Sequence, residues 1–258
     1  MITSTANARV KELLQLQKKS KARTKENVFI VEGLRMFQEV PKERLKQVYF
    51  SESFYQRRKE ELSLDDYQFE ILSDTVFSYV SDTKSPQGVL CVVSQMEYQL
   101  KEVLSGDHPH IIVLDNLQDP GNMGTIVRTA EGAGVTGIVM SQDCVDIYNP
   151  KVIRSTMGSI YRMPFVYVED IVGAVQVMKE QNIRTFAAHL EGKNSYDEAD
   201  YTHSCAFLIG NEGNGLRDEV AAQADEFIRI PMQGQVESLN AAIAASVLMF
   251  ETARQRRR

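Results

Sequence analysis

Short apolar runs separated by helical patterns dominate residues 110–258, and this alternation constrains the fold more than any other feature. Five runs stand out, at 110–116 (HIIVLDN), 137–141 (GIVMS), 184–190 (RTFAAHL), 205–211 (CAFLIGN) and 226–232 (EFIRIPM). Strands that are apolar along most of their length suit a parallel sheet, because crossover helices cover both of its faces. We therefore predict an α/β domain built on a parallel sheet.

A second and smaller α/β unit is predicted in residues 1–95. Strand patterns occur at 28–33, 47–51, 68–72 and 88–94, and helical patterns at 6–22, 34–40, 53–62 and 74–80. We interpret the basic run KKSKARTKEN (18–27) as a loop, and residues 96–109 as a linker between the domains. A chain of 258 residues suits one large domain or two domains of modest size, and the two separate strand patterns favour two.

Composition argues against several protein classes. The sequence has no apolar stretch long enough to span a membrane, and its first residues lack the apolar core of a signal peptide. Cys91, Cys144 and Cys205 are far apart and odd in number, so neither a disulfide framework nor a zinc site is expected. We expect a cytoplasmic protein that uses no metal and no membrane.

The net charge of −6 is distributed unevenly along the chain. Residues 1–50 carry a net charge of +6, residues 51–253 carry −16, and residues 254–258 contain four arginines. Two basic ends fit contact with a polyanion, although a solvated basic surface without a partner explains the same pattern. Charge alone leaves both interpretations open.

Three polar segments follow predicted strands, at the edge where open α/β sheets bind ligands. In the first, DNLQDPGNMGTIVRTAEGAG (115–134), a turn precedes Asn122, a candidate helix cap, and Arg128 lies one turn after Gly124. The segment GAGVTG (132–137) matches a dinucleotide fingerprint, but it follows a helix and precedes a strand. Because such a site requires the reverse order, we interpret its first glycines as a helix end.

The second segment, LIGNEGNGL (208–216), places Glu212 among closely spaced glycines, which let the backbone approach a ligand. An ordinary turn between a strand and a helix is the alternative. The third segment, IRIPMQGQVESLNAAIAASVLMFE (228–251), delivers Ser238 and Asn240 to the start of a helix, where Ser238 alone would suggest a cap. That helix is apolar nearly all round, so it must lie in a core or an interface.

Together and in this order, the three segments resemble the signature motifs of the SpoU (TrmH) family of SPOUT methyltransferases, which methylate ribose 2′-hydroxyls of RNA. The matches are NxGxxxR at Asn122, Gly124 and Arg128, GNEGxGL at 210–216, and IPMxGxxxSLN at 230–240. Residues 1–95 resemble, more weakly, the substrate-binding domain often attached to this family, which is similar to a ribosomal RNA-binding protein. The pieces that match are TSTANARVKELLQL and FIVEGLRMFQEV.

The resemblance implies that residues 110–258 form a SPOUT domain whose parallel sheet carries a deep trefoil knot. It also implies S-adenosyl-L-methionine as cofactor, and a homodimer through the C-terminal domain with the active site at the subunit interface. The candidate catalytic residues are Arg128, Asn122, Glu212, Ser238 and Asn240. The candidate cofactor-binding residues are Leu208, Ile209, Gly210, Ile230, Met232, Ser238 and Leu239. The candidate RNA-binding residues are Lys18, Lys19, Lys21, Arg23, Lys25 and Arg128.

The expected reaction is methylation of a ribose 2′-hydroxyl in RNA, with ribosomal RNA favoured over transfer RNA by the N-terminal domain. A guanidinium is a poor general base, so we expect Arg128 to grip an RNA phosphate and stabilise charge on the 2′-oxygen. Water or that phosphate would then relay the proton. The alternative is a catalytically inactive RNA-binding or ribosome-assembly protein with the same fold. Removing residues 1–95 is expected to leave a folded core that still binds the methyl donor.

Overall fold

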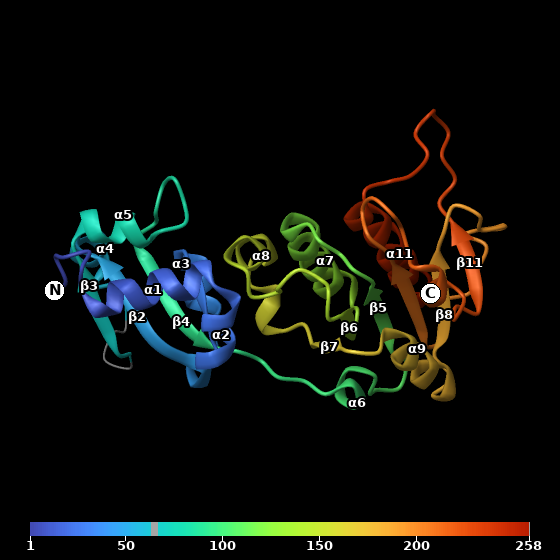
Figure 1. The fold of residues 1–258 in the computed structure, drawn as a ribbon, viewed down its shortest axis with the longest axis horizontal. Coiled ribbons are helices and arrows are strands. Elements are labelled where there is room, and N and C mark those ends of the chain that lie inside the picture. Colours follow the sequence, from blue (N-terminus) through green and yellow to red (C-terminus); the bar gives the residue numbers. More distant parts are fainter. Residues whose placement is uncertain (63–66, 258) are drawn as a thin grey trace. The chain divides into compact units, whose positions relative to one another are not determined.

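The computed structural model describes residues 1–62 and 67–257, and the chain divides into two compact units (Figure 1). The first comprises Met1–Met96 and Asp146–Tyr161, and the second comprises Glu97–Val145 and Arg162–Arg258. The chain leaves the first unit close to the predicted boundary at residue 95. The segment Asp146–Tyr161, which the sequence places in the C-terminal domain, belongs to the first unit.

The first unit contains a four-stranded mixed sheet with the order β1-β4-β2-β3. Strand β4 is antiparallel to β1 and β2, and β2 is parallel to β3. All four strands lie where the sequence predicts them. Their bounds are Val28–Glu32 for β1, Leu45–Ser51 for β2, Phe69–Leu72 for β3 and Val89–Ser94 for β4.

Helices and one internal segment supply the layers that cover this sheet. The helices are α1 (Ala8–Lys18), α2 (Ser20–Glu26), α3 (Leu34–Glu39), α4 (Glu52–Arg58), α5 (Asp74–Val80) and α8 (Pro150–Thr156), with 3₁₀ turns at Lys42–Arg44 and Ser159–Tyr161. Apolar residues of α1 and α5 share a core with the sheet. Strand β1 also packs against the 146–161 segment, where the rings of Phe29 and Tyr148 lie 4.8 Å apart and α8 contacts the strand.

The second unit contains a seven-stranded sheet in which every pairing is parallel, with the order β7-β6-β5-β10-β8-β11-β9. The strands are β5 (His110–Leu114), β6 (Gly137–Ser141), β7 (Phe165–Val168), β8 (Arg184–Ala188), β9 (Asn194–Ser195), β10 (Cys205–Ile209) and β11 (Glu226–Arg229). The predicted parallel α/β fold is confirmed. Strands β7 and β9, which the sequence prediction missed, are short edge strands with incomplete burial.

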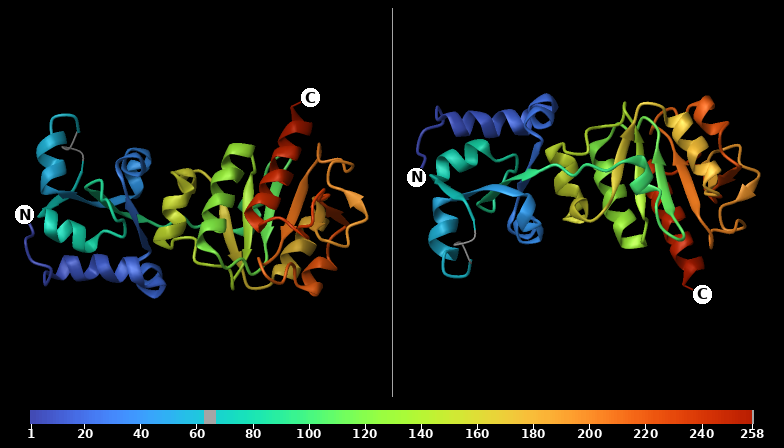
Figure 2. Two further views of the ribbon diagram at one scale, coloured as in Figure 1. Left: turned by 90° about the horizontal axis from the view of Figure 1, so that it is seen from above. Right: turned by 90° about the horizontal axis from the view of Figure 1, so that it is seen from below.

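Helices cover both faces of this sheet (Figure 2). On one face α6 (Leu100–Val103), α9 (Ile171–Glu180) and α10 (Asp218–Ala221) share the apolar core. On the other face α7 (Pro120–Ala133) and α11 (Ala241–Arg256) pack against each other. Because α6 lies within the predicted linker at 96–109, that segment contributes core residues as well as a connection. The trefoil knot stays an expectation of the family resemblance.

The residues that cap α7 and α11 differ from the two predicted caps, Asn122 and Ser238. Asp119 caps α7, since its Oδ1 accepts a hydrogen bond of 2.8 Å from the backbone N–H of Asn122. Pro120 then fills the first helical position, where its missing N–H costs nothing. The helix ends at Gly134 with φ +75°, as predicted for this glycine-rich end. Asn240, and not Ser238, caps α11.

The basic segment predicted as a loop at 18–27 is a helix, α2, closed by Asn27 in the left-handed conformation. Its lysines, alanine and glutamate are good helix formers, and the loop prediction undervalued them. Arg23 is only 3% exposed, and its Nη1 donates to the carbonyls of Leu16 (2.7 Å) and Gln17 (3.1 Å). Its Nη2 pairs with Asp146. The prediction that Arg23 contacts RNA is therefore wrong, because its charge is already used inside the first unit.

Candidate active site

The first two motifs meet because β5 and β10 are parallel neighbours, so the loops after them leave the same edge of the sheet. The backbone N–H of Asp115 donates to the carbonyl of Ile209 at 2.9 Å. Beyond the strands, the Asn211 side-chain amide donates to the carbonyl of Asn116 at 2.8 Å. The loops at 115–119 and 210–216 therefore start from a shared and rigid base.

The glycine loop folds back on itself directly after β10. Asn211 and Gly215 exchange two backbone hydrogen bonds of 2.9 and 3.0 Å, and Gly215 takes φ +71°. A Cβ atom at Gly210 would lie 2.1 Å from the backbone carbon of Gly215 and from the nitrogen of Leu216. Only glycine fits at position 210, because two stretches of backbone touch there.

The carboxylate of Glu212 binds the N-terminal end of α7. It accepts hydrogen bonds from the backbone N–H groups of Asp119 (3.0 Å) and Gln118 (3.3 Å), and from the Nδ2 of Asn122 (2.9 Å). Partial burial acts to raise the pKa of Glu212, but hydrogen bonding to Asn122 and to backbone N–H groups, including that of Glu212 itself, together outweighs it and lowers the pKa. Glu212 is therefore a charged acceptor at neutral pH.

Asn122 and Asn240 continue this chain of hydrogen bonds to the third motif. The Nδ2 of Asn240 donates to the Oδ1 of Asn122 at 3.0 Å, and the Oδ1 of Asn240 accepts from the N–H groups of Ala242 (2.9 Å) and Ile243 (3.3 Å). A carboxylate at one end can only accept and backbone N–H groups at the other can only donate, so both amide orientations are determined. Three of the five candidate catalytic residues thus form one connected chain, Glu212–Asn122–Asn240.

The other two candidates lie outside this chain. Arg128 is exposed on α7 and forms no hydrogen bond or ion pair with any other residue that the structure describes. Gly124, predicted to leave open space beside it, is buried. Ser238 is also exposed and forms no hydrogen bond within residues 1–62 and 67–257. Both side chains are available to a substrate.

The candidate cofactor-binding positions lie at the carboxyl end of β10 and beyond the carboxyl ends of β10 and β11. Leu208 and Ile209 are buried, with Leu208 inside the apolar core, so only their backbone can meet a ligand. Among the described residues, the backbone of 230–239 forms no backbone hydrogen bond, which leaves its N–H and C=O groups free. This segment includes Ile230, Met232 and Leu239. A donor held largely through backbone groups fits these residues.

The sequence prediction missed a pair of charged residues beneath the glycine loop. Asp115, fully buried at the end of β5, accepts hydrogen bonds from Arg217, the residue that follows the loop. Asp115 could have been noticed as a charged residue directly after a buried apolar run. Arg217 had no local signal, because its partner lies 102 residues away.

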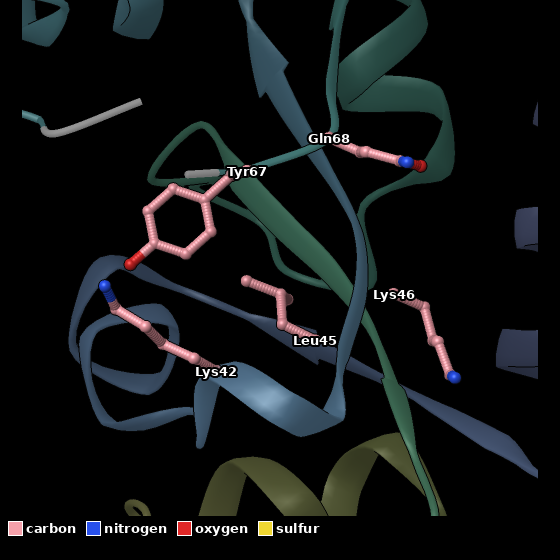
Figure 3. A pocket seen from close by; sticks show the side chains of 5 residues that line it. All are labelled: Lys42, Leu45, Lys46, Tyr67 and Gln68. Atoms are coloured by element: carbon pink, nitrogen blue, oxygen red, sulfur yellow. The ribbon is translucent and has the colours of Figure 1, made fainter. Parts of the chain in front are cut away.

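Other features that suggest ligands lie away from the motif residues. A hollow in the first unit is lined by Lys42, Leu45, Lys46, Tyr67 and Gln68, with the Lys42 Nζ 5.9 Å from the centre of the Tyr67 ring (Figure 3). The described part of the chain offers neither a cluster of metal ligands nor a helical membrane span. No group of three or more His, Cys, Asp or Glu side chains in it is placed to hold a metal ion.

Within the same residues, no helix has the length and apolar character needed to cross a membrane.

Two family models match the chain, one in its N-terminal part and one in its C-terminal part. The SpoU rRNA Methylase family model matches residues 109–250, and the MRM3-like substrate binding domain model matches residues 7–91. The chain is 31% identical over 251 residues to the 23S rRNA (guanosine(2553)-2'-O)-methyltransferase RlmP of Bacillus subtilis, covering 96% of this chain and 97% of the relative. It is 33% identical over 162 residues to the 23S rRNA (guanosine-2'-O-)-methyltransferase RlmB of Xylella fastidiosa, covering 62% of this chain and 65% of that one.

A solved structure is similar along nearly the whole chain. The AdoMet-bound rRNA methyltransferase from Sinorhizobium meliloti is 29% identical, with a TM-score of 0.84, and the similarity covers 98% of this chain and 97% of that one. The family model spans more than half of the present chain, and the Bacillus relative matches it almost from end to end. The chain therefore belongs to the SpoU rRNA Methylase family.

Proposed function

We propose that this protein transfers a methyl group from S-adenosyl-L-methionine to a ribose 2′-hydroxyl of ribosomal RNA. The observation that carries the proposal is the chain Glu212–Asn122–Asn240, which joins all three motifs of a ribose methyltransferase at one edge of the sheet. Membership of the SpoU family supports the reaction class, and the named relatives support ribosomal RNA as the substrate. The reaction is expected in the cytoplasm.

The donor-binding role falls to backbone rather than to side chains. When bound, S-adenosylmethionine supplies an electrophilic methyl group attached to a sulfonium. Residues 208–210, 230–232 and 238–239 would hold it through N–H and C=O groups, and the missing side chain of Gly210 lets the backbone at residues 215–216 pack against the end of β10. Glu212 holds the N-terminal end of α7 while Asn240 holds the start of α11, so the polar chain orients the two helices that border the site.

Arg128 is the candidate for direct contact with the substrate. Its guanidinium is exposed and has no partner among the described residues, so it can grip an RNA phosphate and stabilise negative charge that develops on the 2′-oxygen. A protonated guanidinium has no free lone pair to accept a proton, which makes it a poor general base. Water or the gripped phosphate takes the proton, and positioning supplies much of the acceleration.

Two surfaces fit the expected partners. Lys18, Lys19, Lys21 and Lys25 are exposed around α2 and can meet RNA phosphates. The side chains of Ile243 and Phe250, seven residues apart on α11, are 49% and 51% exposed although both are large and apolar. Residues at this spacing share a helix face, so a second copy of the chain covering α11 would bury them. This supports a homodimer through the C-terminal domain.

The proposal is tested by methyl incorporation. Purified protein, labelled S-adenosylmethionine and 23S rRNA from a strain lacking the gene should give labelled ribose, and mapping 2′-O-methyl groups in total RNA should locate the nucleotide. Calorimetry with S-adenosylmethionine provides an independent measurement of donor binding. RNA binding without donor binding would instead support an inactive RNA-binding or ribosome-assembly protein.

The role of Arg128 needs its own variant. Arg128→Lys should lower the single-turnover rate at saturating RNA at least tenfold, because a lysine cannot form the paired hydrogen bonds of a guanidinium. The matched control is Arg162→Lys, at an arginine of the same unit that is 45% exposed and paired with Glu131. A rate unchanged in Arg128→Lys, with only RNA affinity reduced, would limit Arg128 to binding.

A further inference from the structure

A buried carboxylate is joined to an arginine beneath the glycine loop. The Asp115 side chain is 0% exposed and receives three hydrogen bonds from Arg217. The Arg217 backbone N–H donates to Oδ2 at 3.0 Å, its Nε donates to Oδ1 at 2.9 Å, and its Nη2 also donates to Oδ1. A planar guanidinium can make such a paired contact and an ammonium cannot.

Arg217 also reaches a third loop of the site. Its Nη1 lies 3.4 Å from the Oδ2 of Asp143, in the loop after β6. The backbone carbonyl of Asp143 accepts a hydrogen bond from the side-chain amide of Gln118, whose own N–H donates to Glu212. One guanidinium therefore connects the loops after β5, β6 and β10. Hydrogen bonding to Asp115, aided by the charges of Asp115 and Asp143, raises the pKa of Arg217.

The glycine loop needs an anchor of this kind. Gly210, Gly213 and Gly215 give residues 210–216 little stiffness of their own, because glycine populates more backbone conformations than any other residue. Strand β10 holds the first end of the loop. At the second end Leu216 is buried, and Arg217 follows immediately with its three bonds to Asp115. Glu212 lies midway between these anchors, where a small shift of the loop would move its carboxylate away from Asn122.

We propose that Arg217 and Asp115 are positioning residues for the methyl transfer: together they hold the glycine loop so that Glu212 stays on the end of α7 and the Gly210 backbone stays in place for the donor. This inference rests on the proposed function for its catalytic consequence. Its structural core, a loop kept in register by the pair, stands independently of the reaction. The competing explanation is an ion pair that contributes only to global stability.

The experiment compares Arg217→Met and Arg217→Lys with a matched control in the full-length protein. The control is Arg184→Met, because Arg184 pairs with Glu226 at 2.7 Å and is 53% exposed, close to the 40% of Arg217. Arg184 begins β8, at the opposite end of the strands from the site. Three quantities are measured for each variant: amide exchange of residues 211–216, the dissociation constant for S-adenosylmethionine, and the melting temperature.

Arg217→Met should exchange the amides of 211–216 at least tenfold faster than the wild type and bind the donor at least tenfold more weakly. Arg217→Lys, which keeps a charge beside Asp115 and should fold, is expected between the two. Arg184→Met should lower the melting temperature alone. Exchange and donor affinity within threefold of the wild type in both Arg217 variants, with only a lower melting temperature, would overturn the proposal. If the wild type binds no donor, the proposed function fails, and the exchange rates still decide whether the pair positions the loop.

Discussion

Deleting residues 1–96 alone is expected to leave a second unit that is folded but self-associates, because the deletion uncovers the segment Asp146–Tyr161. This segment belongs to the first unit although it lies between β6 and β7. Its buried apolar side chains are Ile147, Tyr148, Val152, Ile153, Ile160 and Tyr161. The sequence alone predicts that removal of 1–95 leaves a folded core that still binds the methyl donor but methylates RNA poorly, and the structure adds the exposed segment.

The magnitude follows from these six side chains. Burying an apolar side chain of this size contributes about 1.5–3 kcal/mol, so the six together represent roughly 9–18 kcal/mol of burial. A dissociation constant of 1 μM corresponds to about 8 kcal/mol. Association through the uncovered segment can therefore be strong even after the entropic cost of bringing molecules together. The Tyr148 hydroxyl also loses its hydrogen bonds to the N–H (2.7 Å) and carbonyl (2.8 Å) of Met96.

The assay compares two truncated proteins. One lacks residues 1–96, and the other also has 146–161 replaced by a Gly/Ser linker of equal length. The first should bind a hydrophobic dye and form species larger than a dimer in sedimentation, whereas the second should do neither. Both should melt at similar temperatures, because the core formed by α6, α9 and α10 is unchanged. If the first protein sedimented as cleanly as the second and bound no dye, the reasoning would be refuted.

Three further predictions concern charge, pH and assembly. Replacing Lys18, Lys19 and Lys21 with alanine should weaken RNA binding and flatten its salt dependence by roughly 0.7–0.9 per lost phosphate contact, while donor affinity stays constant; an unchanged slope would leave these lysines without an RNA partner. Burial, aided by the charge of nearby Arg256, lowers the pKa of His110 to about 3 in the folded protein. Below about pH 6.5 this histidine therefore binds a proton in the unfolded state but not in the folded state, and the free energy of unfolding falls as the pH drops. Between pH 7 and pH 5 this histidine should cost roughly 2 kcal/mol in denaturant titrations at fixed protein concentration, and His110→Phe should lack that part of the loss. Phe250→Asp should shift the protein from dimer to monomer in sedimentation, and a variant that stays dimeric would place the interface away from this face of α11.

The C-terminal arginines are a second candidate surface for RNA, but the structure shows that two of them are already bound to other groups of the protein. Arg254 pairs with Glu251, and Arg256 donates hydrogen bonds to the carbonyls of Tyr201, His108 and His203. These two guanidinium groups are therefore already engaged in contacts within the second unit. Arg257 is exposed, and Arg258 lies outside the described residues. The exposed lysines around α2 therefore remain the stronger candidates for phosphate contact.

Local patterns in the sequence were enough to predict the parallel sheet and the motif loops. An apolar run indicates a buried strand, and glycines with capping residues indicate a turn between a strand and a helix. Both features can be recognised in the sequence because each depends only on residues a few positions apart. Asn122, Glu212 and Asn240 could be selected as candidate residues for this reason, because each lies in a motif loop after a predicted strand. The hydrogen bond between Asn122 and Glu212 follows from the adjacency of β5 and β10, and the bond from Asn240 to Asn122 follows from the packing of α11 against α7; only the fold establishes both.

Only the tertiary structure decided which charges were already paired and which segment belonged to which unit. Arg23 looks like its neighbouring lysines in the sequence, yet it is buried because Asp146, 123 residues later, receives its charge. Arg217 likewise depends on Asp115, across 102 residues. The periodicity of a sequence indicates which face of a helix or strand is buried. It does not indicate the partner of an ion pair, because that partner can lie on a distant segment that only the fold brings close. The assignment of Asp146–Tyr161 to the first unit has the same cause, since its apolar pattern shows that it must be buried and the fold determines against which sheet.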